Sequence, residues 1–61
     1  MAEFLAIERC DRCGAPALVE TSHVNGVLLW CAHHAREHRV LDLMLATRVH
    51  PSLERERVAA K

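Results

Sequence analysis

The sequence predicts a small α+β domain in which a cysteine knuckle, a β-hairpin and one long α-helix follow one another along the chain. Three observations lead to this prediction. Cys10 and Cys13 form a Cys-x-x-Cys pair, and a Cys-x-x-His pair follows at residues 31–34. An Asn-Gly pair at residues 25–26 separates two apolar segments. Residues 32–50 then contain many helix-forming side chains and no Gly or Pro.

The chain is short enough for its hydrophobic core to be marginal. With 61 residues, it would bury only about 60% of the surface that the unfolded chain exposes, and domains of this size usually need a disulfide, a metal or a partner. We expect one domain at residues 10–50, with an N-terminal lead at residues 1–9 and a polar C-terminal tail at residues 51–61. The lead is apolar at Phe4, Leu5 and Ile7, and it either packs on the core or frays.

Composition and charge exclude several classes of protein. The 8 Lys and Arg residues balance 8 Asp and Glu residues, so the net charge provides no general attraction to nucleic acid. The 3 Cys residues cannot form a closed set of disulfides, and no signal-peptide pattern precedes them. No apolar run approaches the roughly 20 residues that span a membrane. We therefore expect a cytoplasmic protein that uses its Cys residues to bind metal.

Residues 10–14 are predicted to form the knuckle. The spacing of Cys10 and Cys13 allows a tight turn to point both sulfurs inward, while backbone N–H groups of the turn donate to the thiolates. Gly14 follows directly, at the point where the chain leaves the turn and where a positive φ is favourable.

Residues 17–31 are predicted to form the β-hairpin. Asn25-Gly26 favours a two-residue type I′ turn, which would place Thr21 opposite Trp30. Both faces of the hairpin contain apolar residues, so their alternation leaves open which face is covered. The second strand would end at Cys31.

One helix is predicted from Ala32 to Val49. The segment is rich in Ala, Leu, Arg and Glu, which are good helix formers. Because the residue before a Pro disfavours helix, Pro51 should end the helix near His50. Pro51 also suits the first position of a second, short helix in the tail. A frayed and solvated tail is the alternative.

Cys10, Cys13, Cys31 and His34 form a ligand set that is typical of one tetrahedral Zn²⁺ ion. Protein groups would fill all the positions, so we expect a closed, structural site. His33 competes with His34 as the fourth ligand, and we favour His34 because Cys-x-x-His spacing fits the first turn of a helix. A redox Cys-x-x-Cys would need a βαβ setting that this chain is too short to build. The order of knuckle, hairpin and helix is that of treble-clef-like zinc fingers.

Two motifs also carry a resemblance to known proteins. Residues 10–17 read Cys-Asp-Arg-Cys-Gly-Ala-Pro-Ala, and residues 31–38 read Cys-Ala-His-His-Ala-Arg-Glu-His. They resemble a group of very small, uncharacterised zinc-finger proteins from actinobacteria and their phages. The resemblance implies a cytosolic zinc module of bacterial or phage source, and it implies no catalytic residue. It covers about half of the chain, including the whole metal site, and the chain after Arg39 lies outside it.

The predicted helix is apolar around most of its circumference, which is usual for a helix that is buried on more than one side. Burying a Leu, Val or Met side chain is worth roughly 1.5–3 kcal/mol, so a partner is expected on the side away from the hairpin. That side carries Val40, Leu43, Met44 and Thr47. We therefore expect an interaction module that binds another protein or its own copy, such as a bacterial or phage regulatory adapter. The alternative is that the lead and the tail fold over this side.

Two other functions are weighed against this one. Arg36, Arg39 and Arg48 lie on the predicted helix and suggest nucleic-acid binding. Intervening acidic residues, the balanced charge and the scarcity of aromatic side chains for stacking speak against it. We expect no enzymatic activity and no small-molecule substrate, because the sequence contains no recognisable nucleophile–base pair, phosphate loop or open metal position.

Overall fold

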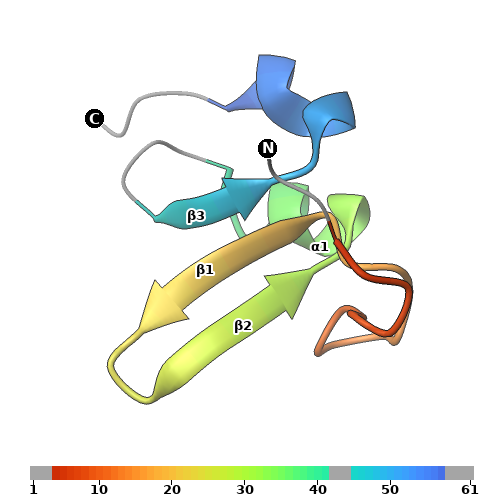
Figure 1. The fold of residues 1–61 in the computed structure, drawn as a ribbon. Coiled ribbons are helices and arrows are strands. Elements are labelled where there is room, and N and C mark those ends of the chain that lie inside the picture. Colours follow the sequence, from red (N-terminus) through yellow and green to blue (C-terminus); the bar gives the residue numbers. More distant parts are fainter. Residues whose placement is uncertain (1–3, 42–44, 58–61) are drawn as a thin grey trace.

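The computed structural model describes residues 4–41 and 45–57, and within these ranges the chain forms a three-stranded sheet, one α-helix and one 3₁₀ helix (Figure 1). In chain order the elements are β1 (Val19–His23), β2 (Gly26–Trp30), α1 (Ala32–Glu37), β3 (Ala46–Val49) and η1 (Pro51–Glu56). The small α+β fold is confirmed, but it has a short helix where one long helix was predicted. No helix in the described ranges is long and apolar enough to cross a membrane.

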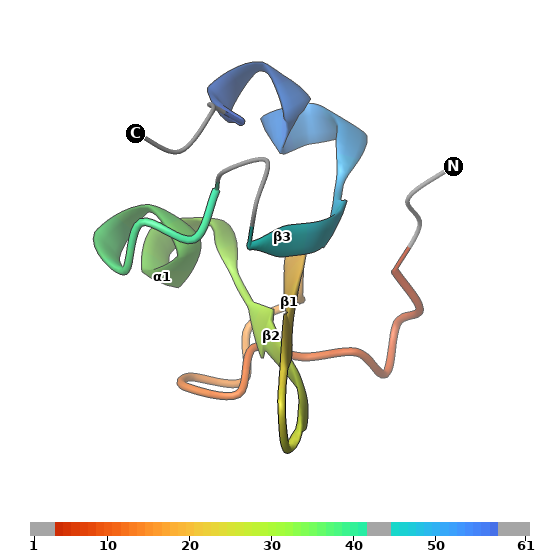
Figure 2. The same ribbon diagram turned by 90° about the vertical axis from the view of Figure 1, so that its left-hand side faces the viewer.

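The sheet is antiparallel, with the strand order β2-β1-β3. Figure 2 shows it edge-on, with α1 on one side and the N-terminal lead on the other. Val19, Thr21 and Trp30 share one face and are buried. Val19 and Trp30 belong to the same apolar cluster as Ala35 of α1, so this is the covered face of the hairpin, which the alternation of the sequence had left open.

The hydrophobic core lies between this face of the sheet, α1, the segment that follows α1, and η1. Its buried members are Val19, Trp30, Ala35, Val40, Leu41, Ala46, Val49 and Leu53. Thr21 is buried on the same face, and its hydroxyl accepts a hydrogen bond from Trp30 Nε1 at 2.9 Å. Because a buried hydroxyl is costly without a partner, this bond fixes the position of the Trp30 ring over β1.

The hairpin forms where the sequence predicts it, but its register differs by two residues. Thr21 pairs with Leu28 instead of Trp30, and His23 pairs with Gly26. A type I′ turn needs a positive φ at both central residues. Gly26 has a φ of 130°, whereas Asn25 is not among the residues with positive φ. The chain therefore reverses one position earlier, and Gly26 becomes the first residue of β2. Because the shift is of two residues, the same side chains still share each face.

The prediction of one helix from Ala32 to Val49 is wrong, because α1 ends at Glu37. The N–H of Val40 donates to the carbonyl of Ala35 at 3.0 Å, and the N–H of Arg39 donates to that of Arg36 at 3.2 Å. This pair of bonds is a Schellman cap, in which the residue after the helix is left-handed. Arg39 takes that position with a φ of 54°. Val40, which follows, is buried in the core.

The second half of the predicted helix contains a strand, β3, which pairs with β1. Val49 lies opposite Val19 and Ala46 opposite Thr21, with a bulge between them that leaves Thr47 without a partner residue on β1. A bulge adds one residue to one strand, so Ala46 and Val49 both point into the core although they are three positions apart. The local pattern therefore lacks the strict alternation by which a strand is recognised.

Two of the four residues predicted to bind a partner, Val40 and Thr47, do not lie on a common helix. Val40 is buried in the core, and Thr47 lies on β3, where its hydroxyl donates to the backbone oxygen of Glu20 at 3.2 Å. Leu43 and Met44, the other two members, lie outside the described residues. Val40 and Thr47 belong to different elements, so they cannot form one helical face.

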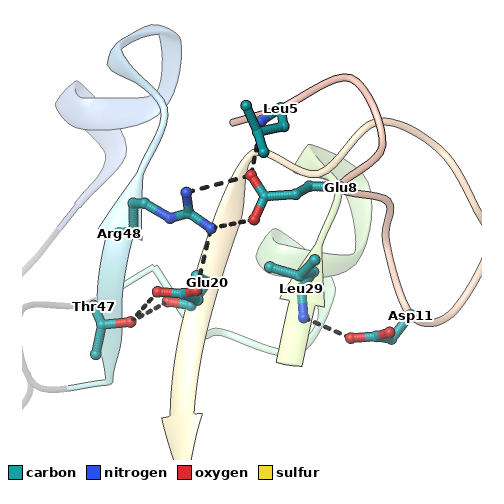
Figure 3. A network of polar contacts seen from close by, with 7 residues as sticks. All are labelled: Leu5, Glu8, Asp11, Glu20, Leu29, Thr47 and Arg48. Atoms are coloured by element: carbon teal, nitrogen blue, oxygen red, sulfur yellow. Dashed lines mark hydrogen bonds and ion pairs between the residues drawn. The ribbon is translucent and has the colours of Figure 1, made fainter. Parts of the chain in front are cut away.

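The N-terminal lead packs on the outer face of the sheet through one ionic network (Figure 3). The guanidinium of Arg48 contacts the Glu8 carboxylate at 2.6 Å and the Glu20 carboxylate at 3.1 Å, and it lies over the Phe4 ring, 4.1 Å from the ring centroid. The hydrogen bond from Arg48 lowers the pKa of Glu8. The other apolar side chains of the lead, Leu5 and Ile7, are exposed.

The chain after β3 continues as the 3₁₀ helix η1. Pro51 occupies its first turn, and the His50 ring accepts a hydrogen bond from the N–H of Ser52 at 3.0 Å, which caps the helix. Leu53 is buried in the core. On the surface, Arg36 of α1 makes two hydrogen bonds of 2.7 Å each to the Glu56 carboxylate, and these bonds link η1 to α1.

Candidate metal centre

The structure brings the four predicted ligand residues together. Cys10 and Cys13 come from the knuckle, Cys31 from the end of β2, and His34 from the first turn of α1. Their four donor atoms all lie within 4.8 Å of one another. This site therefore joins three segments of the chain and could hold one metal ion.

The knuckle is shaped by its backbone. The N–H of Gly14 donates to the carbonyl of Cys10 at 2.9 Å, and the N–H of Cys10 donates to the carbonyl of Ala15 at 2.7 Å. Gly14 has a φ of 80°, which a residue with a Cβ rarely adopts. The N–H of Arg12 points at the Cys10 sulfur, 3.4 Å away. The turn thus aims both sulfurs at one point and supplies a donor to a thiolate, as predicted for a Cys-x-x-Cys-Gly sequence.

Asp11 attaches the knuckle to the sheet. Its N–H donates to the carbonyl of Leu29 at 2.9 Å, and its carboxylate accepts the N–H of Leu29 at 2.7 Å (Figure 3). This contact extends the edge of β2 and fixes the knuckle beside Cys31. The sequence reasoning missed Asp11, and its only signal is a carboxylate placed between two ligand cysteines.

Cys31 caps α1 and also carries a donor sulfur. Its backbone is extended, and its sulfur accepts the N–H of His34 at 3.5 Å. The carbonyl of Cys31 accepts the N–H of Ala35 at 2.9 Å, which opens the helix. The change from strand to helix at Cys31 places His34 one turn further, on the same side as the sulfur.

The distances between the donor atoms fit a tetrahedral ion. Bonds of 2.3 Å to sulfur and 2.0–2.1 Å to nitrogen give edges of about 3.8 Å between two sulfurs and about 3.6 Å between sulfur and nitrogen. The structure has 3.7 Å between the sulfurs of Cys13 and Cys31. His34 Nδ1 lies 3.4 Å from the Cys31 sulfur and 3.5 Å from that of Cys10. A disulfide would need about 2.05 Å, so this is the spacing of separate ligands.

His33 does not join this group. Its side chain is 77% exposed, and its Nε2 lies 3.8 Å from the Glu37 carboxylate. The side chain of His34 is 19% exposed and directs Nδ1 toward the sulfurs. Of the two candidates for the fourth ligand, His34 is the one that the structure brings to the cysteines.

The cysteines influence one another electrostatically. Burial opposes a charge on Cys10, but the N–H groups of Arg12, Cys31 and Cys13 outweigh it and lower the pKa of the Cys10 thiol to about 6. At Cys13 the N–H of Ala15 favours the thiolate. Burial and the two neighbouring sulfurs outweigh this effect, and the pKa of Cys13 is raised. Bringing several thiolates together is thus unfavourable without a cation, and a divalent metal removes that repulsion.

A protein-family model described as a domain of unknown function, DUF7455, matches residues 4–57, which is more than half of the chain. No curated protein and no solved structure matches significantly. The matched range includes every candidate ligand and all the described strands and helices.

Proposed function

The chain belongs to the DUF7455 family of domains of unknown function, and from its site we propose that it is a zinc-binding domain in which one Zn²⁺ ion stabilises the fold. Cys10, Cys13, Cys31 and His34 are the proposed ligands. The observation that carries the proposal is the spacing of their donor atoms, 3.4–3.7 Å for the three recorded contacts. Thiolates with one imidazole in a tetrahedral arrangement favour zinc over hard cations such as magnesium and calcium.

The elements around the site explain why the chain would need the ion. The helix α1 has 6 residues, whereas isolated helices shorter than about 12–15 residues are marginal in water. The whole chain has 61 residues, and a domain of this size has a marginal hydrophobic core of its own. The ion would cross-link the knuckle, the end of β2 and α1, and apparent zinc affinities of about 10–16 kcal/mol are typical of zinc-finger peptides. With four protein ligands, the ion has no open position for a substrate, so the proposal includes no catalytic role.

Cobalt substitution tests the identity of the ligands. The Co²⁺-loaded chain should show the intense visible bands of a tetrahedral site and the near-ultraviolet bands of thiolate ligation, and Zn²⁺ should displace one equivalent. The variants Cys31→Ser and His34→Ala should weaken or change these bands. The matched control His33→Ala should leave them unchanged. Octahedral spectra, or a greater effect of His33→Ala than of His34→Ala, would refute this ligand set.

We further propose that the domain is an interaction module, and that a protein partner binds at the turn end of the hairpin. Val24 is 99% exposed there, Val27 is 54% exposed and Leu28 is 40% exposed. β2 is an edge strand. Asp11 contacts its outer edge at Leu29, and among the described residues no further strand pairs with that edge. An open, apolar edge is suited to an extended partner segment that adds a strand. This surface replaces the helical face that the sequence had suggested.

A photo-crosslinking side chain at Val24 tests the interaction, because this residue touches little of its own chain. In cells, we expect a discrete adduct that Val27→Glu abolishes. Leu5→Glu, which changes another exposed apolar residue, should leave it intact. An adduct of twice the chain mass would assign the partner as a second copy. The absence of a discrete adduct would refute the proposed surface.

The described contacts do not favour nucleic-acid binding. Arg36 is paired with Glu56, and Arg48 is paired with Glu8 and Glu20. Both arginines were part of the nucleic-acid hypothesis, and both now have carboxylates of the same chain beside them. The proposal is therefore limited to zinc and a protein partner.

A further inference from the structure

Three imidazoles surround one carboxylate on α1. Oε1 of Glu37 lies 3.8 Å from Nε2 of His33, 4.0 Å from Nε2 of His34 and 4.0 Å from Nε2 of His38. Of these rings, only that of His34 also reaches the cysteines. Glu37 thus stands directly behind a proposed zinc ligand, on the side away from the sulfurs.

The ring of His34 needs an acceptor on that side. A neutral imidazole has one nitrogen with a lone pair and one that carries hydrogen. If Nδ1 binds zinc, Nε2 carries the hydrogen. The His34 side chain is 19% exposed, and a partly buried N–H is costly without a partner. Glu37 is three residues further along the helix, where side chains of a helix meet.

The same geometry speaks against a second metal at this position. His33, His34 and Glu37 also lie within 4.8 Å of one another, so their spacing alone would allow an ion. However, His34 belongs to both groups, and a neutral ring cannot give a lone pair to two metals. The two groups are therefore better explained as a single ion with one carboxylate behind its ligand.

We propose that Glu37 is a positioning residue that accepts the Nε2–H of His34 and holds the ring in the orientation that binds zinc. The inference rests on the zinc site proposed above. The present separation of 4.0 Å is too long for a hydrogen bond. The proposed hydrogen bond would have a length of about 2.7–2.9 Å, and the side chain of Glu37, which is 57% exposed, is the part that would move to make it. Metal-bound histidines commonly donate their second N–H to such a carboxylate.

The substitution Glu37→Ala separates this role from a merely structural one. Ala is a better helix former than Glu, and a carboxylate in the last turn opposes the helix dipole. A purely structural effect would therefore leave α1 equally or more stable and would not weaken metal binding. The proposed role predicts the opposite, because loss of an outer carboxylate typically lowers metal affinity by about 10–100-fold.

Competition with a chromophoric chelator measures this affinity on the full chain. We expect about 10–100-fold weaker zinc binding for Glu37→Ala, a smaller loss for Glu37→Gln, which keeps an acceptor oxygen, and no change for His33→Ala. In ¹⁵N-resolved NMR spectra of the zinc-loaded protein, the Nε2–H of His34 should exchange slowly, and Glu37→Ala should speed that exchange.

Wild-type affinity in Glu37→Ala would overturn the inference. A second equivalent of zinc that both His33→Ala and Glu37→Ala abolish would also overturn it, because the cluster would then be a separate metal site. Either result would leave the zinc site itself intact, provided that His34→Ala still abolishes tight binding. If the wild-type chain bound no zinc, the proposed function would fail first.

Discussion

Replacing Arg39 by Gly should stabilise the protein. Arg39 has a φ of 54°, and the left-handed conformation costs a residue with a Cβ roughly 1–2 kcal/mol. Gly avoids this cost but loses about 0.5–1 kcal/mol through the greater freedom of the unfolded chain. The net gain should therefore lie within about 0–1.5 kcal/mol, with a central value of about 0.75 kcal/mol. At about 4–8 °C per kcal/mol for a domain of this size, this central value raises the midpoint of thermal unfolding by about 3–6 °C.

The sign of this change in stability distinguishes a helix that is capped after Glu37 from one that continues through residue 39. If the helix continued through residue 39, Gly would sit in a helix interior and would destabilise the chain by several tenths of a kcal/mol, up to about 1 kcal/mol. Arg39→Ala is the matched control, because it removes the same side chain but keeps the Cβ and so should give no comparable gain. Unfolding must be followed at a fixed concentration of free zinc, since bound metal raises apparent stability. A lower midpoint for Arg39→Gly than for Arg39→Ala would refute the capped end of α1.

Three further predictions follow from the packing and the charges. Leu53→Ala should destabilise the domain by about 2–5 kcal/mol, because Leu53 is 4% exposed in the core; denaturant unfolding should show no comparable loss for Leu5→Ala. Glu8→Gln should lower stability at neutral pH, because the ion pair with Arg48 holds the pKa of Glu8 below its usual value. This difference from the wild type should be present above the ordinary pKa of a Glu carboxyl and should shrink as the pH falls through the lowered one; a difference that grows in acid would contradict it. Zinc affinity, measured by competition, should decrease as the pH is lowered and should decrease more steeply below about pH 6, where the Cys10 thiol of the metal-free chain is also protonated.

The metal site could be predicted from the sequence because its information is local. Cys-x-x-Cys and Cys-x-x-His each fix the separation of two donors within one turn, whatever the rest of the chain does. Gly14 adds a backbone requirement that few other residues meet. The single long-range element, which brings the knuckle to Cys31, is supplied by a hairpin whose Asn-Gly signal is strong. Asp11, which completes this connection, leaves no comparable pattern.

The register of the hairpin could not be predicted with the same certainty. Asn25-Gly26 identifies the position of the turn to within one residue, but several turn types use Gly at a positive φ. The turn that forms puts Gly26 at the start of β2 and sets Trp30 opposite Val19. In this register Trp30 packs in the core and its Nε1 donates to the hydroxyl of Thr21, and neither contact is visible in the local sequence.

The end of α1 was missed because its cap uses an unexpected residue. The left-handed residue of a Schellman cap is usually a Gly, which can be recognised in the sequence. Here Arg39 takes that position. The strand that follows was also hidden. Thr47 and Val49 are good strand formers, but the bulge at Thr47 turns Ala46 and Val49 to the same side. That spacing of three also occurs on one face of a helix, so periodicity favoured the wrong element.

The central claim is that the chain folds around one zinc ion, and amide NMR spectra recorded while the metal is removed test it most directly. With one equivalent of Zn²⁺ bound, the ¹H–¹⁵N spectrum should be well dispersed. Stepwise addition of a strong chelator should replace it with the narrow spectrum of an unfolded chain, and renewed zinc should restore the original. A spectrum that remained dispersed after the metal had been removed would contradict the claim, because the sheet and its core would then remain folded without the ion.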